Sequence, residues 1–449
     1  MSVACLGLAS IEAGADELAE LRERLDVQAR QIEALERQLG NRSGAAPAKR
    51  ANEFVIRTED GENRIRLRGV LHFDGRHFED DFTPETADTF LLRRVRPSIE
   101  GTLNGLYDFR FVPDFAGGRT IILDAYLAAR LRPWAVLTAG KFKVPVGLER
   151  LVSASDLRFI ERAFPTSLLP NRDLGVQLSG EVAGGAVTYS VGYFNGVSDG
   201  GSSDGQTPAD AENDTKGDWA ARVFFQPFLK SDGVLRGLGF GLAGTYVDST
   251  GTQTTTLLPG YRTPGQQTFF SYRGASSGSA TFADGERIRL TPQFHYFLGR
   301  FGALGEYARV RQDVTRVTSS GARMASLEHD AWHLQLAWSL TGEEQSLKGL
   351  KPASDFSLDR GTWGAFELVA RYHELDIDDA AFAGGADSFA DPATAASQAR
   401  AWGVGLNWYL NRNYKVAVNY DVTRFDGGAA GGADRPDERA LFTRFAVGF

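Results

Sequence analysis

From residue 53 onward, apolar side chains recur at every second position in one segment after another. In residues 120–131, Ile121, Leu123 and Ala125 share one face of an extended strand, and Asp124 and Tyr126 share the other. The same alternation recurs in residues 174–181, 187–193, 287–296, 332–339, 402–408 and 416–422. Strands of this kind form either a soluble sandwich with a dry core or a membrane barrel with a wet interior.

The composition excludes several other classes of protein. No apolar run approaches the roughly 18 residues that a membrane helix needs. The single cysteine, Cys5, rules out a disulfide framework and a cysteine-based zinc cage. The net charge of −8 argues against a nucleic-acid partner. No catalytic triad, phosphate-cradling loop or metal-ligand spacing occurs in a suitable setting, so we expect no enzyme, no cofactor and no metal site.

Three features favour the membrane barrel over the sandwich. Aromatic residues recur near the ends of the apolar faces, where headgroup-level girdles lie, at Trp134, Trp219, Trp332, Trp338, Trp402, Trp408 and Tyr414. Tight turns alternate with long polar connections at 144–172, 195–216, 248–284, 376–398 and 425–439. The last residues alternate and end on Phe449, as outer-membrane barrels commonly do. The prediction is an all-β, antiparallel transmembrane barrel of about sixteen strands around an aqueous channel, over residues 53–449.

The N-terminal 52 residues have a different pattern. Leucine and isoleucine recur at three- and four-residue spacings over residues 16–39, which predicts a short coiled-coil helix in the periplasm that has a partner, or an amphipathic helix lying on its own barrel. Residues 40–52 are a Gly/Pro/Ala linker. Residues 1–15 have the small apolar character of a shortened signal peptide or leader, and a misplaced start would explain their missing basic residues.

Side-chain parity predicts a charged lumen. Nine arginines and one lysine are expected to point inward on strands: Arg94, Arg96, Arg110, Arg130, Arg222, Arg287, Arg289, Arg371, Arg444 and Lys415. The long segment 144–172 keeps apolar residues that a solvated loop would not keep, so we expect it to fold into the lumen. It would carry Arg150, Arg158, Arg162 and Arg172 to a constriction. These charges either hydrate a wide interior and pair across it, or attract anions through guanidinium donors.

Several motifs in this order resemble the phosphate-selective porin O and P family. They are Gly140-Lys141-Phe142-Lys143-Val144-Pro145-Val146-Gly147-Leu148-Glu149-Arg150, the Glu161-Arg162 pair, Phe90-Leu91-Leu92-Arg93-Arg94, Leu340-Thr341-Gly342-Glu343 and Gly405-Leu406-Asn407-Trp408-Tyr409. The resemblance implies a trimeric, anion-preferring porin with basic infolded loops and an arginine ladder. It places Arg150 at the family's binding-site lysine, Arg162 at its loop arginine, Arg93 and Arg94 on the ladder, and Asp124 as the acidic partner.

The chain also departs from this family's pattern. Better-known members have an arginine directly after the glycine of the first strand, where this chain has Gly69-Val70. Their arginine series in the fifth outer loop is reduced here to Arg262 and Arg273. Selectivity for phosphate itself therefore does not follow from the resemblance.

The expected function is passive, anion-preferring diffusion of small solutes through a homotrimeric porin in the bacterial outer membrane. The expected partners are small, phosphate-like anions, outer-membrane lipid and lipopolysaccharide. One alternative is a general pore or one selective for sugars or organic acids. Another is a structural tether that uses the N-terminal helix.

Overall fold

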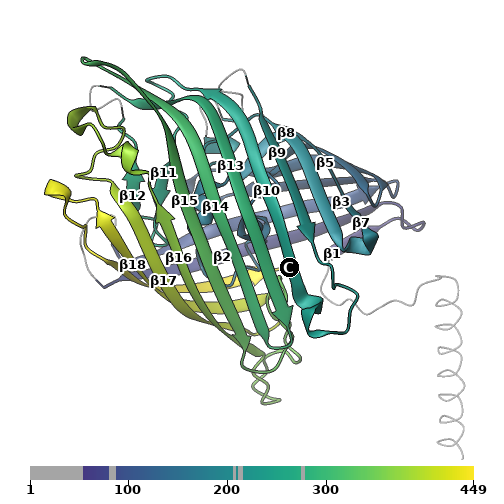
Figure 1. The fold of residues 1–449 in the computed structure, drawn as a ribbon. Coiled ribbons are helices and arrows are strands. Elements are labelled where there is room, and N and C mark those ends of the chain that lie inside the picture. Colours follow the sequence, from purple (N-terminus) through teal and green to yellow (C-terminus); the bar gives the residue numbers. More distant parts are fainter. Residues whose placement is uncertain (1–53, 80–86, 206–208, 211–215, 275–278) are drawn as a thin grey trace, which may run out of the picture. The chain divides into compact units, whose positions relative to one another are not determined.

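The computed structural model describes residues 54–79, 87–205, 209–210, 216–274 and 279–449 (Figure 1). The predicted leader remnant, coiled-coil helix and linker, residues 1–52, lie outside these residues. Within the described ranges, no helix has the length and apolar character needed to cross a membrane.

Sixteen antiparallel strands form a closed barrel, as the alternating pattern predicted. Each strand pairs with the next along the sheet, and β19 pairs with β2 to close it. The strands are β2 (Arg64–Phe78), β3 (Thr89–Leu103), β4 (Tyr107–Asp114), β5 (Ile121–Arg132), β6 (Ala135–Lys143), β7 (Arg172–Val182), β8 (Val187–Phe194), β9 (Asp218–Phe225), β10 (Leu238–Thr250), β13 (Thr281–Leu298), β14 (Phe301–Thr318), β15 (Gly321–Ser339), β16 (Ala365–Asp376), β17 (Ala396–Tyr409), β18 (Tyr414–Gly427) and β19 (Glu438–Gly448).

A short additional strand, β1 (Phe54–Arg57), lies beside the first residues of β2. It pairs with residues 64–67 of β2, and β19 pairs with residues 70–78 of the same strand. Thus β1 continues the line of β19, and the Phe54 and Phe449 rings meet edge to face with their centroids 5.9 Å apart.

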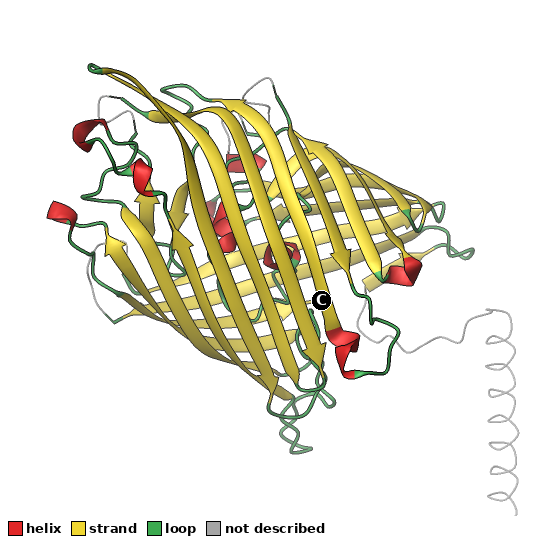
Figure 2. Cartoon of the chain, viewed as in Figure 1, coloured by secondary structure: helices red, strands yellow, loops and turns green. Residues whose placement is uncertain are grey.

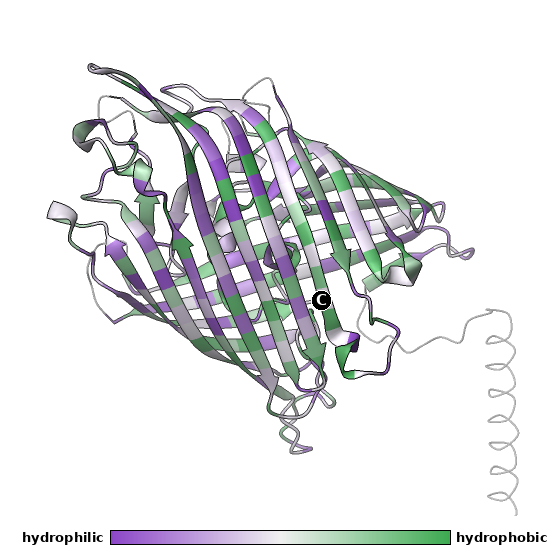
Figure 3. Ribbon diagram, in the orientation of Figure 1, coloured by the Kyte–Doolittle hydropathy of each residue, from purple (hydrophilic) through white to green (hydrophobic). Residues whose placement is uncertain are grey.

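The barrel has its apolar side chains outside and its polar side chains inside. On β15, Trp332 and Trp338 are 39% and 48% exposed, whereas His333 and Gln335 between them are buried. The colouring by hydropathy shows this alternation along the outer strands (Figure 3). A soluble sandwich has the opposite arrangement, so the burial pattern indicates an apolar solvent outside the barrel.

Most connections are short at one end of the barrel and long at the other, with exceptions at 226–237, 319–320 and 340–364. Residues 133–134, 299–300 and 410–413 are short turns at one end. The long connections 144–171, 195–217, 251–280, 377–395 and 428–437 lie at the other. The strands β13, β14 and β15 have 18, 18 and 19 residues, against eight in β4, β8 and β9, so the wall is much taller on one side (Figure 2).

Several of the long connections pack against the inner wall, and the phenylalanines of two of them meet there. The first, residues 144–171, is called the infolded segment and contains the short helices α2 (Leu148–Leu151) and α3 (Pro165–Leu168). The second forms a hairpin of β11 (Gly260–Arg262) and β12 (Thr268–Ser271). Phe164, Phe269 and Phe270 are fully buried together against Val310 and Leu327 of the wall. Part of the lumen is therefore an ordinary apolar core, and the segment 248–284 that was expected as an outer loop contributes to it.

Candidate functional site

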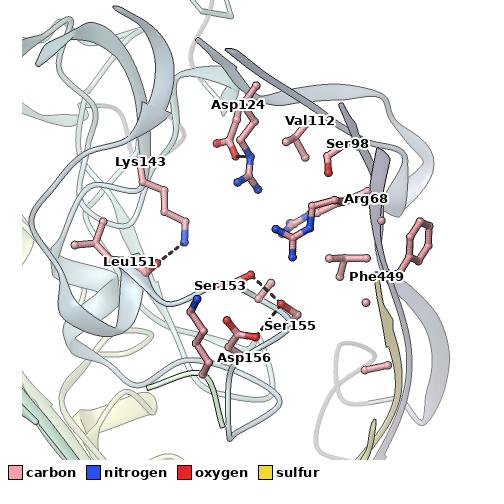
Figure 4. A pocket seen from close by; sticks show the side chains of 18 of the residues that line it. Arg68, Ser98, Val112, Asp124, Lys143, Leu151, Ser153, Ser155, Asp156 and Phe449 are labelled. Carbon is pink, nitrogen blue, oxygen red and sulfur yellow. Dashed lines mark hydrogen bonds and ion pairs between the residues drawn. The ribbon is translucent and has the colours of Figure 1, made fainter. Parts of the chain in front are cut away.

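A cavity of about 730 Å³ remains between the infolded segment and the inner faces of β2–β7 (Figure 4). Arg68, Arg96 and Arg110 line one side of it, and Ser153 and Asp156 of the infolded segment line the other. It reaches the strand ends at Asn411 and Phe449, where the short turns lie. Lys348 and Leu350, from the long turn 340–364, also line it.

Five side chains of β16–β19 fix the infolded segment by binding its main chain. Four donate to carbonyl oxygens: Lys415 Nζ to Leu157 (2.6 Å), Asn407 Nδ2 to Arg158 (3.0 Å), Arg444 to Ile160 (2.8 Å) and Arg371 to Glu161 (2.7 Å). The fifth, Asn419, accepts from the Ile160 N–H through Oδ1 at 2.8 Å. We call Arg371, Asn407, Lys415, Asn419 and Arg444 the wall clamp. Because a buried peptide group is costly to leave unbonded, these contacts hold residues 157–161 in one position.

Three cations beside the cavity bind carbonyl groups rather than carboxylates. Lys143 Nζ donates to Leu151 O at 3.2 Å and Val152 O at 3.0 Å. Arg162 donates to Glu149 O at 3.2 Å and to Val152 O at 2.9 Å, and Arg150 donates to Thr166 O. Among the described residues, no carboxylate oxygen lies within 4.0 Å of these three groups. Lys143, Arg150 and Arg162 are called the basic cluster.

The two arginines of the basic cluster remain charged at neutral pH. Burial, followed by the charge of Arg162, lowers the pKa of Arg150 to about 9. Burial lowers the pKa of Arg162 to about 10, against the opposing effect of the Glu149 carboxylate. Arg172 of β7 adjoins this cluster and is neutralised by Asp124, at 2.7 Å. The two arginines therefore leave a local excess of positive charge behind the cavity wall, and Lys143 is the member of the basic cluster that lines the cavity.

The wall formed by β3–β5 carries paired charges. Arg96 binds Asp114 at 2.7 Å, and Arg130 binds Asp108 at 2.9 Å. Arg110 lies 3.4 Å from both Glu100 and Asp124. These pairs agree with the first of the two expectations for the lumen, in which inward-facing charges pair with one another across the interior.

Arg93 and Arg94 both belong to the inner side because the β2–β3 pairing shifts its register between His72 and Phe73. Such a bulge turns an extra side chain to the same face. Arg94 is buried and lies 3.1 Å from His72 Nδ1. Arg93 binds Glu161 of the infolded segment through two hydrogen bonds, of 2.7 Å and 3.1 Å.

Of the expected pore arginines, Arg96, Arg110 and Arg172 line the cavity. The others lie outside its lining, and four of them are held by other parts of the barrel. Arg158 binds Glu367 at 3.0 Å and Gln345 at 2.8 Å, so it anchors the infolded segment to the opposite wall. Arg289 is 1% exposed and bound by Asp199 and Asp218. Arg287 is buried near Asp218, and Arg222 donates to Gln293 at 3.0 Å. Side-chain parity identified the inner face, but the loops packed on that face cover these residues.

Sequence reasoning missed Lys143 as a member of the site, and it missed the role of the wall clamp. Strict alternation gave no usable signal here, because Phe142 and Lys143 both line the cavity. The clamp asparagines, Asn407 and Asn419, had no signal beyond inward parity, because their partners in the infolded segment lie 249 and 259 residues earlier in the sequence.

Comparisons with known proteins bear on this arrangement. Residues 65–449 match the model of the family described as phosphate-selective porin O and P. The chain is 23% identical to porin O of Pseudomonas aeruginosa over 402 residues, which cover 83% of this chain and 85% of that protein. The fold resembles the anion-selective porin of Comamonas acidovorans, with a TM-score of 0.50, 12% identity and coverage of 86% and 100% of the two chains. It also resembles the trimer form of OmpT, an outer membrane protein of Vibrio cholerae, with a TM-score of 0.51, 12% identity and coverage of 86% and 99%.

Proposed function

Because the chain belongs to the phosphate-selective porin O and P family of outer-membrane porins, we propose that it conducts small anions passively past the basic cluster. The solute passes between the infolded segment and the inner faces of β2–β7. Lys143, Arg150 and Arg162 attract it, and the paired charges of β3–β5 hydrate the rest of the passage. Arg93 and Arg94 lead toward the cluster, and Asp124 orients Arg172 beside it.

The observation that carries this proposal is that no carboxylate oxygen of the described residues lies within 4.0 Å of the basic cluster, in a barrel where most inward arginines have one at that distance. A carbonyl oxygen stabilises a cation without cancelling its charge, so the field of the cluster extends into the cavity. An anion that enters this field supplies the missing charge. A protein-lined passage of this kind favours anions over cations.

Phosphate is one candidate among several small anions. Guanidinium and ammonium donors bind phosphate, carboxylate and chloride alike, and nothing in the basic cluster distinguishes them by shape. Competition of the chloride current by inorganic phosphate, acetate and maltose separates a phosphate pathway from one for organic acids or sugars. Strong block by maltose alone would support the sugar-selective alternative.

The test of anion preference is the reversal potential of the protein in planar bilayers under a potassium chloride gradient. Each charge removed within 4 Å of an ion in water is worth about 1 kcal/mol, or roughly a fivefold change in preference. The double variant Arg150→Ala/Arg162→Ala is therefore expected to lose most of the chloride preference. Arg236→Ala, which removes an exposed arginine paired with Glu344 on a turn, serves as the control and should change nothing. Cation preference of the unmodified protein would refute the proposal.

We propose a homotrimer as the assembled state, in contact with outer-membrane lipid and lipopolysaccharide. The support is the likeness to OmpT of Vibrio cholerae in its trimer form and the apolar outer surface of the barrel. Sedimentation of the detergent-solubilised protein tests the number of subunits.

A further inference from the structure

Glu161 is held by its main chain from one wall while its side chain reaches the other. Arg371 of β16 donates to its carbonyl oxygen at 2.7 Å, and the neighbouring Ile160 is bound by Asn419 and Arg444. The carboxylate instead faces β2 and β3, where Arg76 and Arg93 bind it. The position of the main chain therefore does not depend on the charge of the side chain.

Two guanidinium groups converge on this one carboxylate. Arg93 uses Nε and a terminal nitrogen, at 2.7 Å and 3.1 Å from the two carboxylate oxygens, and Arg76 adds a contact of 3.2 Å. A fork of two parallel donors is the arrangement by which arginine binds planar carboxylates and phosphate oxygens. The Glu161 carboxylate thus marks a position that is built for an oxyanion.

The charge at this position is incompletely balanced. Arg94 lies beside Arg93, and its side chain contacts His72. No carboxylate oxygen of the described residues comes within 4.0 Å of the Arg94 guanidinium group. The nearby Asp74 is engaged by Arg444 at 2.6 Å. Burial raises the pKa of Glu161, but the charges of Arg93 and Arg94 lower it by more than burial raises it. The pKa of Glu161 therefore lies below its ordinary value. The carboxylate is consequently ionised at neutral pH and faces an excess of positive charge.

We propose that Glu161 is a built-in counter-ion that occupies an oxyanion-binding site formed by Arg76 and Arg93, and that a solute phosphate or carboxylate displaces it during passage. The inference rests on the anion pathway proposed above and goes beyond it, because it assigns a specificity-determining role to an acidic residue. Conduction requires binding that is strong enough for entry and weak enough for release. A tethered competitor weakens binding in this sense, because each arriving anion must replace an existing ion pair.

The test is Glu161→Gln, which keeps the size of the side chain and leaves the main-chain contacts unchanged. With the competitor neutralised, the concentration of inorganic phosphate that halves the chloride current is expected to fall about tenfold, which corresponds to 1.4 kcal/mol. The concentration of acetate that halves the chloride current should also fall, because the two Arg93 donors bind carboxylates as well as phosphate. The control is Glu344→Gln, which removes an exposed carboxylate from the pair with Arg236 and should leave the half-blocking concentration unchanged.

The outcomes separate this inference from the proposed function. An unmodified channel that prefers cations overturns the anion pathway itself. An anion-preferring channel whose half-blocking concentration is unchanged or higher in Glu161→Gln overturns only the counter-ion role. If that variant gives no channels, Glu161→Asp is the second measurement. Its shorter side chain loosens the Arg93 fork, and a fall of about twofold supports the proposal while no change refutes it. In an Arg93→Gln background the Glu161→Gln effect should disappear.

Discussion

The anchoring of the infolded segment to β16 allows a quantitative prediction at Arg158. Its guanidinium donates to Glu367 at 3.0 Å, to Gln345 at 2.8 Å and to the carbonyl oxygen of Ser346 at 2.5 Å. Arg158→Met keeps most of the side-chain volume and removes all three hydrogen bonds. A charge-assisted bond contributes about 1.5–3 kcal/mol and each neutral partner about 1 kcal/mol, so the expected loss in unfolding free energy is about 3–5 kcal/mol. Glu367 is fully buried, and its remaining partners Asn407 and Tyr409 do not neutralise it.

The assay is urea unfolding of the detergent-solubilised protein, followed by tryptophan fluorescence. A double-mutant cycle with Glu367→Met supplies the control, because removing both members of a buried pair avoids the isolated charge. The double variant is expected to be more stable than Arg158→Met alone. The reasoning is refuted if Arg158→Met costs less than about 1 kcal/mol, or if the two single effects simply add. Channel recordings should show larger current fluctuations in Arg158→Met, because the segment beside the cavity is held less firmly.

Two further predictions concern the backbone and the pH response. Gly140→Ala is expected to lower the unfolding free energy by more than about 2 kcal/mol in the same urea assay, because Gly140 has φ +127° and an added Cβ would lie 2.3 Å from the Ala125 carbonyl oxygen; a change below 0.5 kcal/mol, about that of a surface substitution, would contradict this. The lowered pKa of Glu161 contributes stability that is complete above its ordinary pKa of 4.5 and is lost as the pH falls through the lowered value. The unfolding midpoint of the unmodified protein should therefore drop more steeply below pH 4.5 than that of Glu161→Gln, and parallel curves would argue against the ion pairs.

The barrel was predictable from the sequence because its physical signal is local and repeated. Each crossing alternates apolar and polar residues, and the two solvents on either side of the wall impose the same pattern sixteen times. Parity also assigned Arg287 and Arg289 to the inner face correctly. It could not show that Asp199, from a connection about ninety residues earlier, seals Arg289 from the cavity. Whether an inward residue meets water depends on which loop packs over it.

For the infolded segment, too, the sequence predicted the general placement but not the contacts of each side chain. Its apolar residues predicted that it packs against other parts of the protein and folds into the lumen. The orientation of each arginine did not follow, since Arg158 turns to β16 while Arg162 turns to the carbonyl groups of its own segment. The bulge at His72 and Phe73 is likewise set by the pairing of two strands, and it moves Arg93 to the inner side where strict alternation admits only Arg94.

The wall clamp has a consequence for how such a channel can change over evolution. It recognises peptide groups, which every residue except proline supplies in full, so the position of the main chain at Glu161 does not depend on the side chain there, whereas Arg158 still anchors the segment. Substitutions at position 161 can alter the solute preference while the passage keeps its width. The clamp thus leaves position 161 free to vary, on a scaffold that need not change when the solute changes.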